Sequence, residues 1–253
     1  MGFKWIAVLG LASMFGIVAG DVGIRQDPAI IHERHGHNAT STNWAGYAVT
    51  GPDGSVTDVK GSWKVPAVNC SSPGVANGYA SFWIGIDGYE SRTVEQIGTD
   101  SDCSSGKPVY YAWYEFYPHQ FFTINTSAPI MPNDTISAEV SYNPGTQQFT
   151  VSLSVNKGAV FSTSTKMNNA RRSSAEWIAE APSGGGIAAL ADFGMMAFNN
   201  CVAKVGNQTG SIGSFPTNVG ITMISTKDSN VVKAQPSSLM ADGFTVTWEN
   251  PGP

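Results

Sequence analysis

Charged residues are scarce in this chain of 253 residues: Asp, Glu, Lys and Arg together make up 13% of it, where a quarter is usual. The net charge is −5 at pH 7, so no basic field attracts phosphates, and nucleic-acid binding is disfavoured. The Glu-, Lys- and Leu-rich periodic segments of coiled coils and helical bundles are also missing. Aromatic residues, by contrast, reach 11%, which excludes disorder because disordered chains are rich in charge and poor in aromatics.

Long apolar runs are confined to the N-terminus. Lys4 precedes an apolar run from Trp5 to Ala19, after which Gly20 leads to the polar Asp21. A run of about 15 residues is short for a membrane-spanning helix, and the pattern is that of a secretory signal peptide. We therefore expect residues 1–20 to be a cleaved signal and the mature protein to be extracellular, with no membrane segment. A retained membrane anchor is the alternative.

Cysteine is rare, with three residues in the chain. An oxidising compartment favours a disulfide, and three cysteines leave one over. Cys70 and Cys103 lie in Ser-rich polar segments, whereas Cys201 follows the segment Phe198-Asn199-Asn200. We expect a Cys70–Cys103 disulfide and a buried thiol at Cys201, with the other pairings left open.

Histidine is also rare, and three of the four lie in residues 21–42. His32 and His35 are three positions apart, whereas two zinc ligands on one helical face are four apart, so we expect no metal site. Residues 21–42 are interpreted as a polar leader or a short pro-segment.

His119 is then the one histidine left in the mature domain to act as the base of a catalytic triad, and it lies in an expected turn. The sequence also contains no G-x-S-x-G elbow of serine hydrolases and no Asp-Thr-Gly signature of pepsin-like peptidases.

From Asn43 onward the apolar pattern alternates with period two. The expected strands are Trp44–Thr50, Thr57–Val65, Tyr79–Ile86, Thr93–Thr99, Val109–Tyr117, Thr135–Tyr142, Gln148–Ser154, Lys157–Thr163, Ser174–Glu180, Ala189–Phe198, Gly220–Ser225 and Gly243–Trp248. Turn residues such as Gly, Pro, Asn and Asp separate them. So many short strands predict an all-β domain over residues 43–253, an antiparallel two-sheet β-sandwich. An open barrel is the alternative.

One face of several expected strands mixes carboxyl groups, an amide and aromatic rings. By alternation, the residues that share such a face within a strand are Trp83 and Asp87; Gln96 and Asp100; Trp113, Glu115 and Tyr117; and Glu176, Ile178 and Glu180. On one sheet these faces would form a groove with aromatic walls and an acidic floor, which favours carboxylate chemistry assisted by an amide. Glu95 falls on the opposite, apolar side, where only an edge position or a buried hydrogen bond would accommodate it.

Five short motifs follow one another along this domain. They are Asn43-Trp44-Ala45-Gly46, Trp83-Ile84-Gly85-Ile86-Asp87-Gly88, Glu95-Gln96-Ile97-Gly98-Thr99-Asp100, Ala112-Trp113-Tyr114-Glu115-Phe116-Tyr117-Pro118 and Ala175-Glu176-Trp177-Ile178-Ala179-Glu180. Together they resemble the glutamic peptidases called eqolisins, which are secreted, acid-acting, pepstatin-insensitive endopeptidases. The resemblance extends from Asn43 to Trp248. It implies a concanavalin A-like β-sandwich similar to lectins and glucanases, in agreement with the strand pattern.

The resemblance also implies residue roles. Gln96 and Glu176 match the catalytic glutamine and glutamate of that family. The residues that match its groove-lining or supporting positions are Trp44, Trp83, Asp87, Asp100, Trp113, Glu115 and Tyr117. The implied protein is a monomeric peptidase that acts on polypeptides without a cofactor or metal. The disulfides of the fungal members are not expected in this chain. Residues 21–42 are short and not Lys-rich, so inhibition of a zymogen by this segment is not expected either.

Two other functions fit the same fold. A lectin-like carbohydrate-binding module would stack sugars on Trp and Tyr rings. A retaining glycosidase would use a pair of carboxyl groups, and Glu176 and Glu180 lie in phase on one strand. Neither function explains the motif around Gln96.

Overall fold

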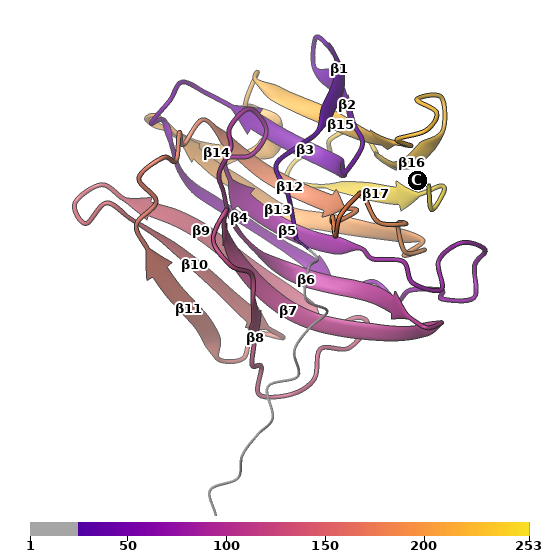
Figure 1. Ribbon diagram of the computed structural model, residues 1–253. Helices are drawn as coiled ribbons and strands as arrows, with labels where there is room; N and C mark the ends of the chain where they lie inside the picture. The colour runs from indigo at the N-terminus through magenta and orange to yellow at the C-terminus, as the bar shows by residue number, and fades with distance from the viewer. Residues whose placement is uncertain (1–24, 253) are drawn as a thin grey trace, which may run out of the picture.

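The computed structural model describes residues 25–252 and consists almost entirely of β-structure (Figure 1). The strands form two stacked layers, so the predicted β-sandwich is confirmed. The two layers are continuous at one side, because one strand, Val232–Pro236, pairs with a strand of each layer. The signal peptide expected in residues 1–20 lies outside the described residues.

The first layer carries most of the residues that the sequence singled out. Its strands are, in spatial order, β8 (Phe122–Ile124), β7 (Lys107–Tyr117), β6 (Val94–Ser104), β5 (Ser81–Ile86), β12 (Ser174–Glu180), β3 (Trp44–Thr50) and β15 (Asn218–Ile224). All of these neighbours are antiparallel. Two further strands extend the layer: β2 (Asn38–Ser41) pairs in parallel with β15, and β1 (Ile31–His35) pairs with β2.

The second layer packs behind the first. Its strands are, in spatial order, β11 (Val160–Thr165), β10 (Gln148–Val155), β9 (Thr135–Asn143), β4 (Val56–Lys64), β13 (Met195–Val205), β17 (Phe244–Trp248) and β16 (Val232–Pro236). A short strand, β14 (Gln208–Ser211), pairs with β13 and is followed by a 3₁₀ turn, η1 (Ile212–Ser214). Among residues 25–252 no helix is long and apolar enough to cross a membrane.

Large aromatic side chains fill the space between the layers. Trp63, Phe149 and Phe198 of the second layer are fully buried, as are Phe82 and Trp177 of the first. Burial of a side chain of this size stabilises the fold by about 2–3 kcal/mol. The two indole N–H groups also find partners: Trp63 donates to the Thr99 hydroxyl at 3.0 Å, and Trp177 donates to a backbone carbonyl at 2.8 Å. The first layer therefore has a rigid support.

Several strands differ from those expected. β13 covers Met195–Val205 rather than Ala189–Phe198, since Gly194 has φ 61° and ends the preceding loop. β6 continues to Ser104. The sequence pattern does not predict the short strands, because segments of three to five residues are too short to show alternation. These strands are β1, β2, β8, β14 and β16.

The N-terminal segment packs against the sandwich from residue 25 onward. Its β1–β2 hairpin belongs to the first layer, and Arg34 joins it to the β5–β6 connection. The Arg34 guanidinium forms an ion pair with Glu90 and lies 4.9 Å from the centre of the Tyr89 ring. Of the segment 21–42, expected as a leader or pro-segment, the described part is thus an ordered portion of the fold.

The predicted disulfide is confirmed. Cys70 and Cys103 are bridged, with Cα atoms 5.5 Å apart. The bridge ties the connection before β5 to the end of β6, at one end of the first layer. Cys201 is a free, buried thiol, as expected, and burial raises its pKa.

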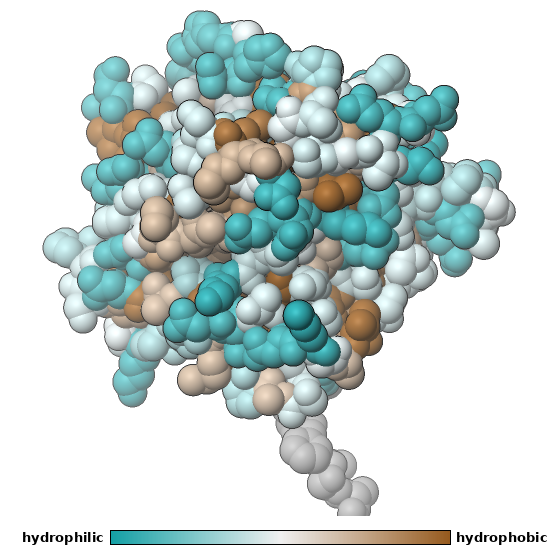
Figure 2. Space-filling view, turned by 180° about the vertical axis from the view of Figure 1, so that it is seen from behind, coloured by the Kyte–Doolittle hydropathy of each residue, from teal (hydrophilic) through white to brown (hydrophobic). Residues whose placement is uncertain are grey.

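The surface is mostly polar. Figure 2 shows the side opposite to that of Figure 1, where apolar side chains form small groups among hydrophilic ones. The large apolar residues that are most exposed in the described chain, Val160, Met195 and Met131, lie in different segments. Scattered apolar residues of this kind are normal for a protein surface.

Candidate active site

Four residues form a row across neighbouring strands of the first layer. Glu176 of β12 pairs with Gly85 of β5, Gly85 pairs with Gln96 of β6, and Gln96 pairs with Glu115 of β7. Paired residues project from the same face of a sheet. The alternate residues, such as Trp177, belong to the main core, so the three polar side chains project from the outer face.

Gly85 lies between Glu176 and Gln96 in this row. The Cα atoms of these two residues are two strand spacings apart, about 10 Å. Gly85 itself places no side chain between them, and a Cβ there would lie 2.9 Å from Cζ3 of Trp83 and 3.3 Å from the Cβ of Gln96. We name the outer face around this row the acidic face; it comprises Gln96, Asp100, Glu115, Glu176 and Glu180.

Glu115 holds the amide of Gln96. Gln96 Nε2 donates to Glu115 Oε2 at 3.2 Å, and both side chains are fully buried. Burial raises the pKa of Glu115 to about 8, opposed by the charge of Arg25 and by hydrogen bonds from Gln26 N–H and Gln96. The contact fixes the orientation of the amide, with its NH₂ group toward Glu115.

Glu176 is buried and has few polar neighbours. Burial raises its pKa well above the ordinary value, and the Ser174 hydroxyl and the Tyr89 N–H oppose this shift. Within the described chain neither carboxyl oxygen makes a hydrogen bond of normal geometry, and Gln96 Oε1 and Glu115 Oε1 are likewise unpartnered. Unpaired buried polar atoms are costly, so their presence in one row is typical of a reactive site.

A second carboxyl group, Glu180, lies next to the tryptophan rings. Glu180 Oε2 accepts a hydrogen bond from Trp83 Nε1 at 2.8 Å. The rings of Trp83 and Trp44 meet edge to face at 4.9 Å. Burial raises the pKa of Glu180 well above its ordinary value. Trp44, Trp83 and Glu180 thus form a buried aromatic and acidic group on this face, which we call the aromatic wall.

Asp100 orients two aromatic side chains rather than the Gln96 amide. Trp113 Nε1 donates to Asp100 Oδ1, and the Tyr111 hydroxyl lies 2.8 Å from Asp100 Oδ2 and 3.0 Å from Asp102 Oδ2. One hydroxyl proton cannot serve two carboxylates, so this pair retains a proton. Burial raises the pKa of Asp100 to about 7, in keeping with that geometry.

Asp87 and Tyr117 support the two ends of the site. Asp87 accepts hydrogen bonds from the N–H groups of Arg172 and Ser173 at 2.7 and 2.9 Å, which fixes the start of β12. Tyr117 is half-buried beside Asp27 and Glu115, and burial raises its pKa.

Glu95 does lie on the core side, as its register predicted, but not at an edge, because β6 is flanked by β5 and β7. Its carboxyl is fully buried with no hydrogen bond of normal geometry among the described residues. Burial, together with the charge of Asp87, raises the pKa of Glu95 well above its ordinary value. The edge position expected from the sequence is therefore wrong, and burial favours the neutral form of Glu95, opposed by the Thr93 side chain.

The segment Arg25–Ile30 lies across the acidic face, and in Figure 1 it passes in front of β5 and β12. Gln96 Nε2 donates to the carbonyl of Gln26 at 2.9 Å. Asp27 N–H donates to Glu180 Oε1 at 2.9 Å, and Trp44 Nε1 donates to the carbonyl of Asp27 at the same distance. The acidic face is therefore in contact with the backbone of this segment of the chain.

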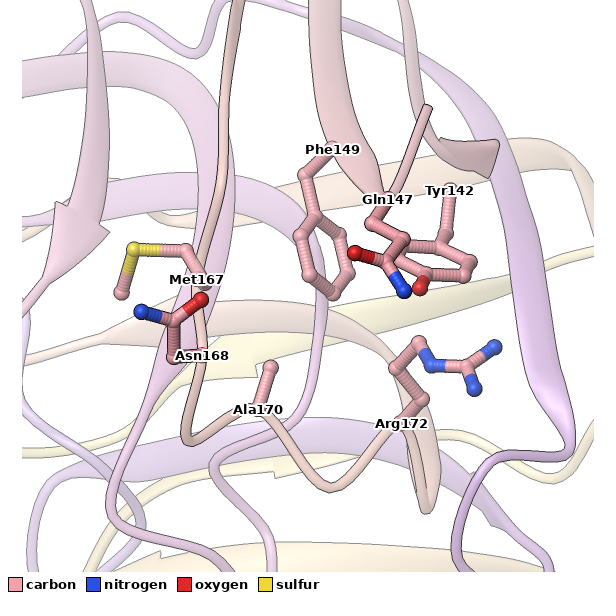
Figure 3. Close-up of a pocket in the computed structure, with 7 residues that line it drawn as sticks. All are labelled: Tyr142, Gln147, Phe149, Met167, Asn168, Ala170 and Arg172. Atoms are coloured by element: carbon pink, nitrogen blue, oxygen red, sulfur yellow. The ribbon is translucent and has the colours of Figure 1, made fainter. Parts of the chain in front are cut away.

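A pocket of about 210 Å³ lies elsewhere (Figure 3). Its lining residues are Tyr142, Gln147, Phe149, Met167, Asn168, Ala170 and Arg172. The Arg172 guanidinium lies 3.9 Å from the centre of the Tyr142 ring. The pocket contains none of the predicted site residues.

In residues 25–252 no group of three or more His, Cys, Asp and Glu side chains is arranged to hold a metal ion.

Sequence comparison places the chain in a family. A model of the peptidase A4 family matches residues 42–248. Aspergillopepsin-2 of Aspergillus niger is 32% identical over 232 residues, which are 82% of this chain and 78% of that protein. The chain belongs to the peptidase A4 family.

Solved structures of A4 peptidases share the fold. Scytalido-glutamic peptidase with a peptide-based transition state analog matches with a TM-score of 0.67 and 22% identity, over 82% of this chain and 98% of that one. Aspergilloglutamic peptidase from Aspergillus niger matches with a TM-score of 0.57 and 27% identity, over 68% and 99%. The resemblance to the eqolisins is confirmed, and the chain is a glutamic endopeptidase of that family.

Some residues of this A4 peptidase site were not assigned from the sequence: Ser81, Tyr111 and Asp102 lie around the aromatic wall. The sequence placed Glu180 on the face of Glu176 without a role in a peptidase, and in the structure Glu180 contacts both Trp83 and Asp27. The contacts of Gln26 had no signal, since they join residues 55 and 70 positions apart.

Proposed function

We propose that the protein is a secreted, acid-acting endopeptidase in which Gln96 and Glu176 form the catalytic dyad. The observation that carries this proposal is the hydrogen bond from Gln96 Nε2 to the carbonyl of Gln26. A donor held against a peptide carbonyl is what stabilisation of a developing oxyanion requires. Glu176 is the nearest carboxyl group in the row on the side away from Glu115.

The reaction needs one proton to move twice. Ionised Glu176 removes a proton from a water molecule, whose oxygen attacks the carbonyl carbon. Gln96 Nε2–H stabilises the negative charge that develops on the carbonyl oxygen. Glu176 then donates the proton to the amide nitrogen, and the C–N bond breaks.

The lower pH limit of activity follows from how Glu176 titrates. Burial raises the pKa of Glu176, and the segment Arg25–Ile30 is part of what covers the acidic face. When this segment leaves, water returns to the face and the pKa of Glu176 falls toward that of an ordinary glutamate. The neutral amide of Gln96 keeps its donors at every pH, so only the glutamate limits the pH range.

The substrates on this proposal are polypeptides, and the mature protein is an extracellular monomer. The test is hydrolysis of acid-denatured casein at pH 3–5 by the purified secreted protein, with pepstatin, a chelator or a serine-peptidase reagent added. We expect activity in all of these conditions. Strong loss of activity with the chelator would contradict the proposal, as would cleavage of a polysaccharide in place of casein.

A further inference from the structure

The carbonyl of Gln26 is held at the acidic face. It accepts the hydrogen bond from Gln96 Nε2 at 2.9 Å, and the backbone of Gln26 also lowers the pKa of Glu115. These contacts fix where the side chain of the residue that carries the attacked carbonyl must point. The side chain of Gln26 is fully buried in that position.

The amide nitrogen of this side chain meets one group, whereas its Oε1 is buried with no hydrogen-bond partner among the described residues. Gln26 Nε2 donates to Ser81 Oγ at 3.0 Å, and Ser81 is itself fully buried on β5. Ser81 lies directly opposite Asp100 on the neighbouring strand β6, and its hydroxyl lowers the pKa of that carboxyl. In its contact with Gln26 the Ser81 oxygen is the hydrogen-bond acceptor.

We propose that Ser81, oriented by Asp100, forms the subsite for the residue before the cleaved bond, and that this subsite selects glutamine. The inference rests on the proposed function and adds the preferred substrate to it. A glutamine side chain is long enough to reach Ser81 and supplies a donor to the hydroxyl oxygen.

The same geometry disfavours two side chains of similar length. Methionine fits the space but has no donor, so it leaves the buried Ser81 oxygen unpaired. Glutamate, once ionised, has no donor either, and burying its unpaired negative charge is costly. In its protonated form glutamate carries one O–H donor, so its exclusion grows as pH rises through its pKa of about 4.3.

The experiment compares matched peptides. The purified protein is held at pH 4 until its activity on denatured casein is constant. Three fluorogenic peptides are then offered that differ only in a central Gln, Met or Glu, and mass spectrometry locates the cleaved bond. We expect kcat/KM for cleavage after Gln to exceed that after Met about tenfold, the usual effect of one buried hydrogen bond. The Gln-to-Glu ratio should rise from pH 4 to pH 6.

The variant Ser81→Ala tests the assigned residue. It removes the acceptor without adding volume, and the Gln-to-Met ratio should fall toward one. Ser101→Ala is the matched control, because Ser101 is a buried serine of β6 that donates to the carbonyl of Pro66 at 3.1 Å. It should leave the ratio unchanged. If Ser81→Ala does not fold, the three peptides and the wild-type protein decide the question.

Two results would overturn the inference. One is equal cleavage after Gln and Met by the wild-type protein, and the other is an unchanged ratio in folded Ser81→Ala. Either result leaves the proposed function intact, since casein is still hydrolysed. Absence of any casein hydrolysis would instead end the proposed function, and with it this assignment.

Discussion

Gln96 and Glu115 lie opposite each other on β6 and β7, and the amide of one donates to the carboxyl of the other at 3.2 Å. Burial raises the pKa of Glu115 to about 8, so below that pH the carboxyl is neutral and holds the amide without competing charge. Glu115 is thus a positioning residue, which sets the direction in which the Gln96 NH₂ group points.

Replacing Glu115 should lower turnover through Gln96. Glu115→Leu removes the acceptor, so the amide loses its fixed orientation, and we expect kcat to fall about tenfold or more. Glu115→Gln keeps an acceptor oxygen of the same length and should restore most of kcat at pH 4. The measurement is kcat and KM on one peptide, with circular dichroism to confirm folding. Equal loss in both variants would show that the role is not positioning.

The dyad makes a sharper prediction. Glu176→Gln keeps the size of the side chain but cannot accept a proton from water, and kcat should fall by about 10² to 10⁴. Gln96→Ala should cost about 10² to 10³, and the double variant should be little worse than the worse single one. Glu139→Gln, an exposed glutamate of β9 paired with Lys60, is the control and should keep full activity. A folded Glu176→Gln protein with more than about a tenth of the wild-type kcat would end the dyad assignment.

Gly85 should be intolerant of a side chain. The Cβ of Gly85→Ala would lie 2.9 Å from Cζ3 of Trp83 and 3.3 Å from Cβ of Gln96. We expect a loss of stability of about 1–3 kcal/mol together with a lower kcat, because the Gln96 side chain must shift. Gly145→Ala, in the β9–β10 turn, meets only a side-chain oxygen at 3.2 Å and serves as the control. Thermal melting and kcat on one peptide measure both effects; unchanged kcat in Gly85→Ala would contradict the packing argument.

Stability should fall as pH rises. Burial raises the pKa of Asp100 to about 7 and that of Glu115 to about 8, whereas in the unfolded chain both titrate near pH 4. Between these limits the folded protein holds more protons than the unfolded chain, so each group lowers the free energy of unfolding by about 1.4 kcal/mol per pH unit. The stabilisation is full below pH 4 and lost by pH 8. Thermal melts from pH 3 to pH 8 measure it, and a Tm that rises over this range would refute the prediction.

The disulfide should stabilise the fold without taking part in catalysis. Cys70 and Cys103 are 33 positions apart, and closing a loop of this size is worth about 4 kcal/mol in the chain-entropy model. The double variant Cys70→Ser, Cys103→Ser should lose that much stability in urea and keep its kcat where it is still folded. Non-reducing peptide mapping of Cys201→Ala should show the bridge intact. Loss of the bridge in that variant would mean that the thiols exchange.

The sequence predicted some strands well. The expected bounds of β3 and β12 agree with the structure, in which nearly every residue of both strands is buried. Alternation also placed Gln96 with Asp100, and Glu176 with Glu180, on one face of their strands, although it could not tell which strands are neighbours. The pairing of β12 with β5 joins residues far apart in the chain, and only the resemblance to a family linked them in advance.

Other features could not be read from the sequence for physical reasons. The contact of Gln26 with Ser81 depends on where a strand-free segment lies in space, and no periodicity encodes it. Glu95 is a carboxylic acid in an apolar setting, against the usual preference of that side chain. Burial favours the neutral form of Glu95, and a pattern of residue types does not show that this side chain is buried.

The two neighbours Glu95 and Gln96 point to opposite faces of β6, one into the core and one into the acidic face. A shift of β6 by a single residue would exchange them: a carboxyl would stand where the amide is needed, and the amide would be buried among apolar side chains. The chain can therefore accept insertions in the Asp87–Thr93 connection far more readily than inside β6. In laboratory evolution, length changes that keep activity should collect in that connection and spare the strand.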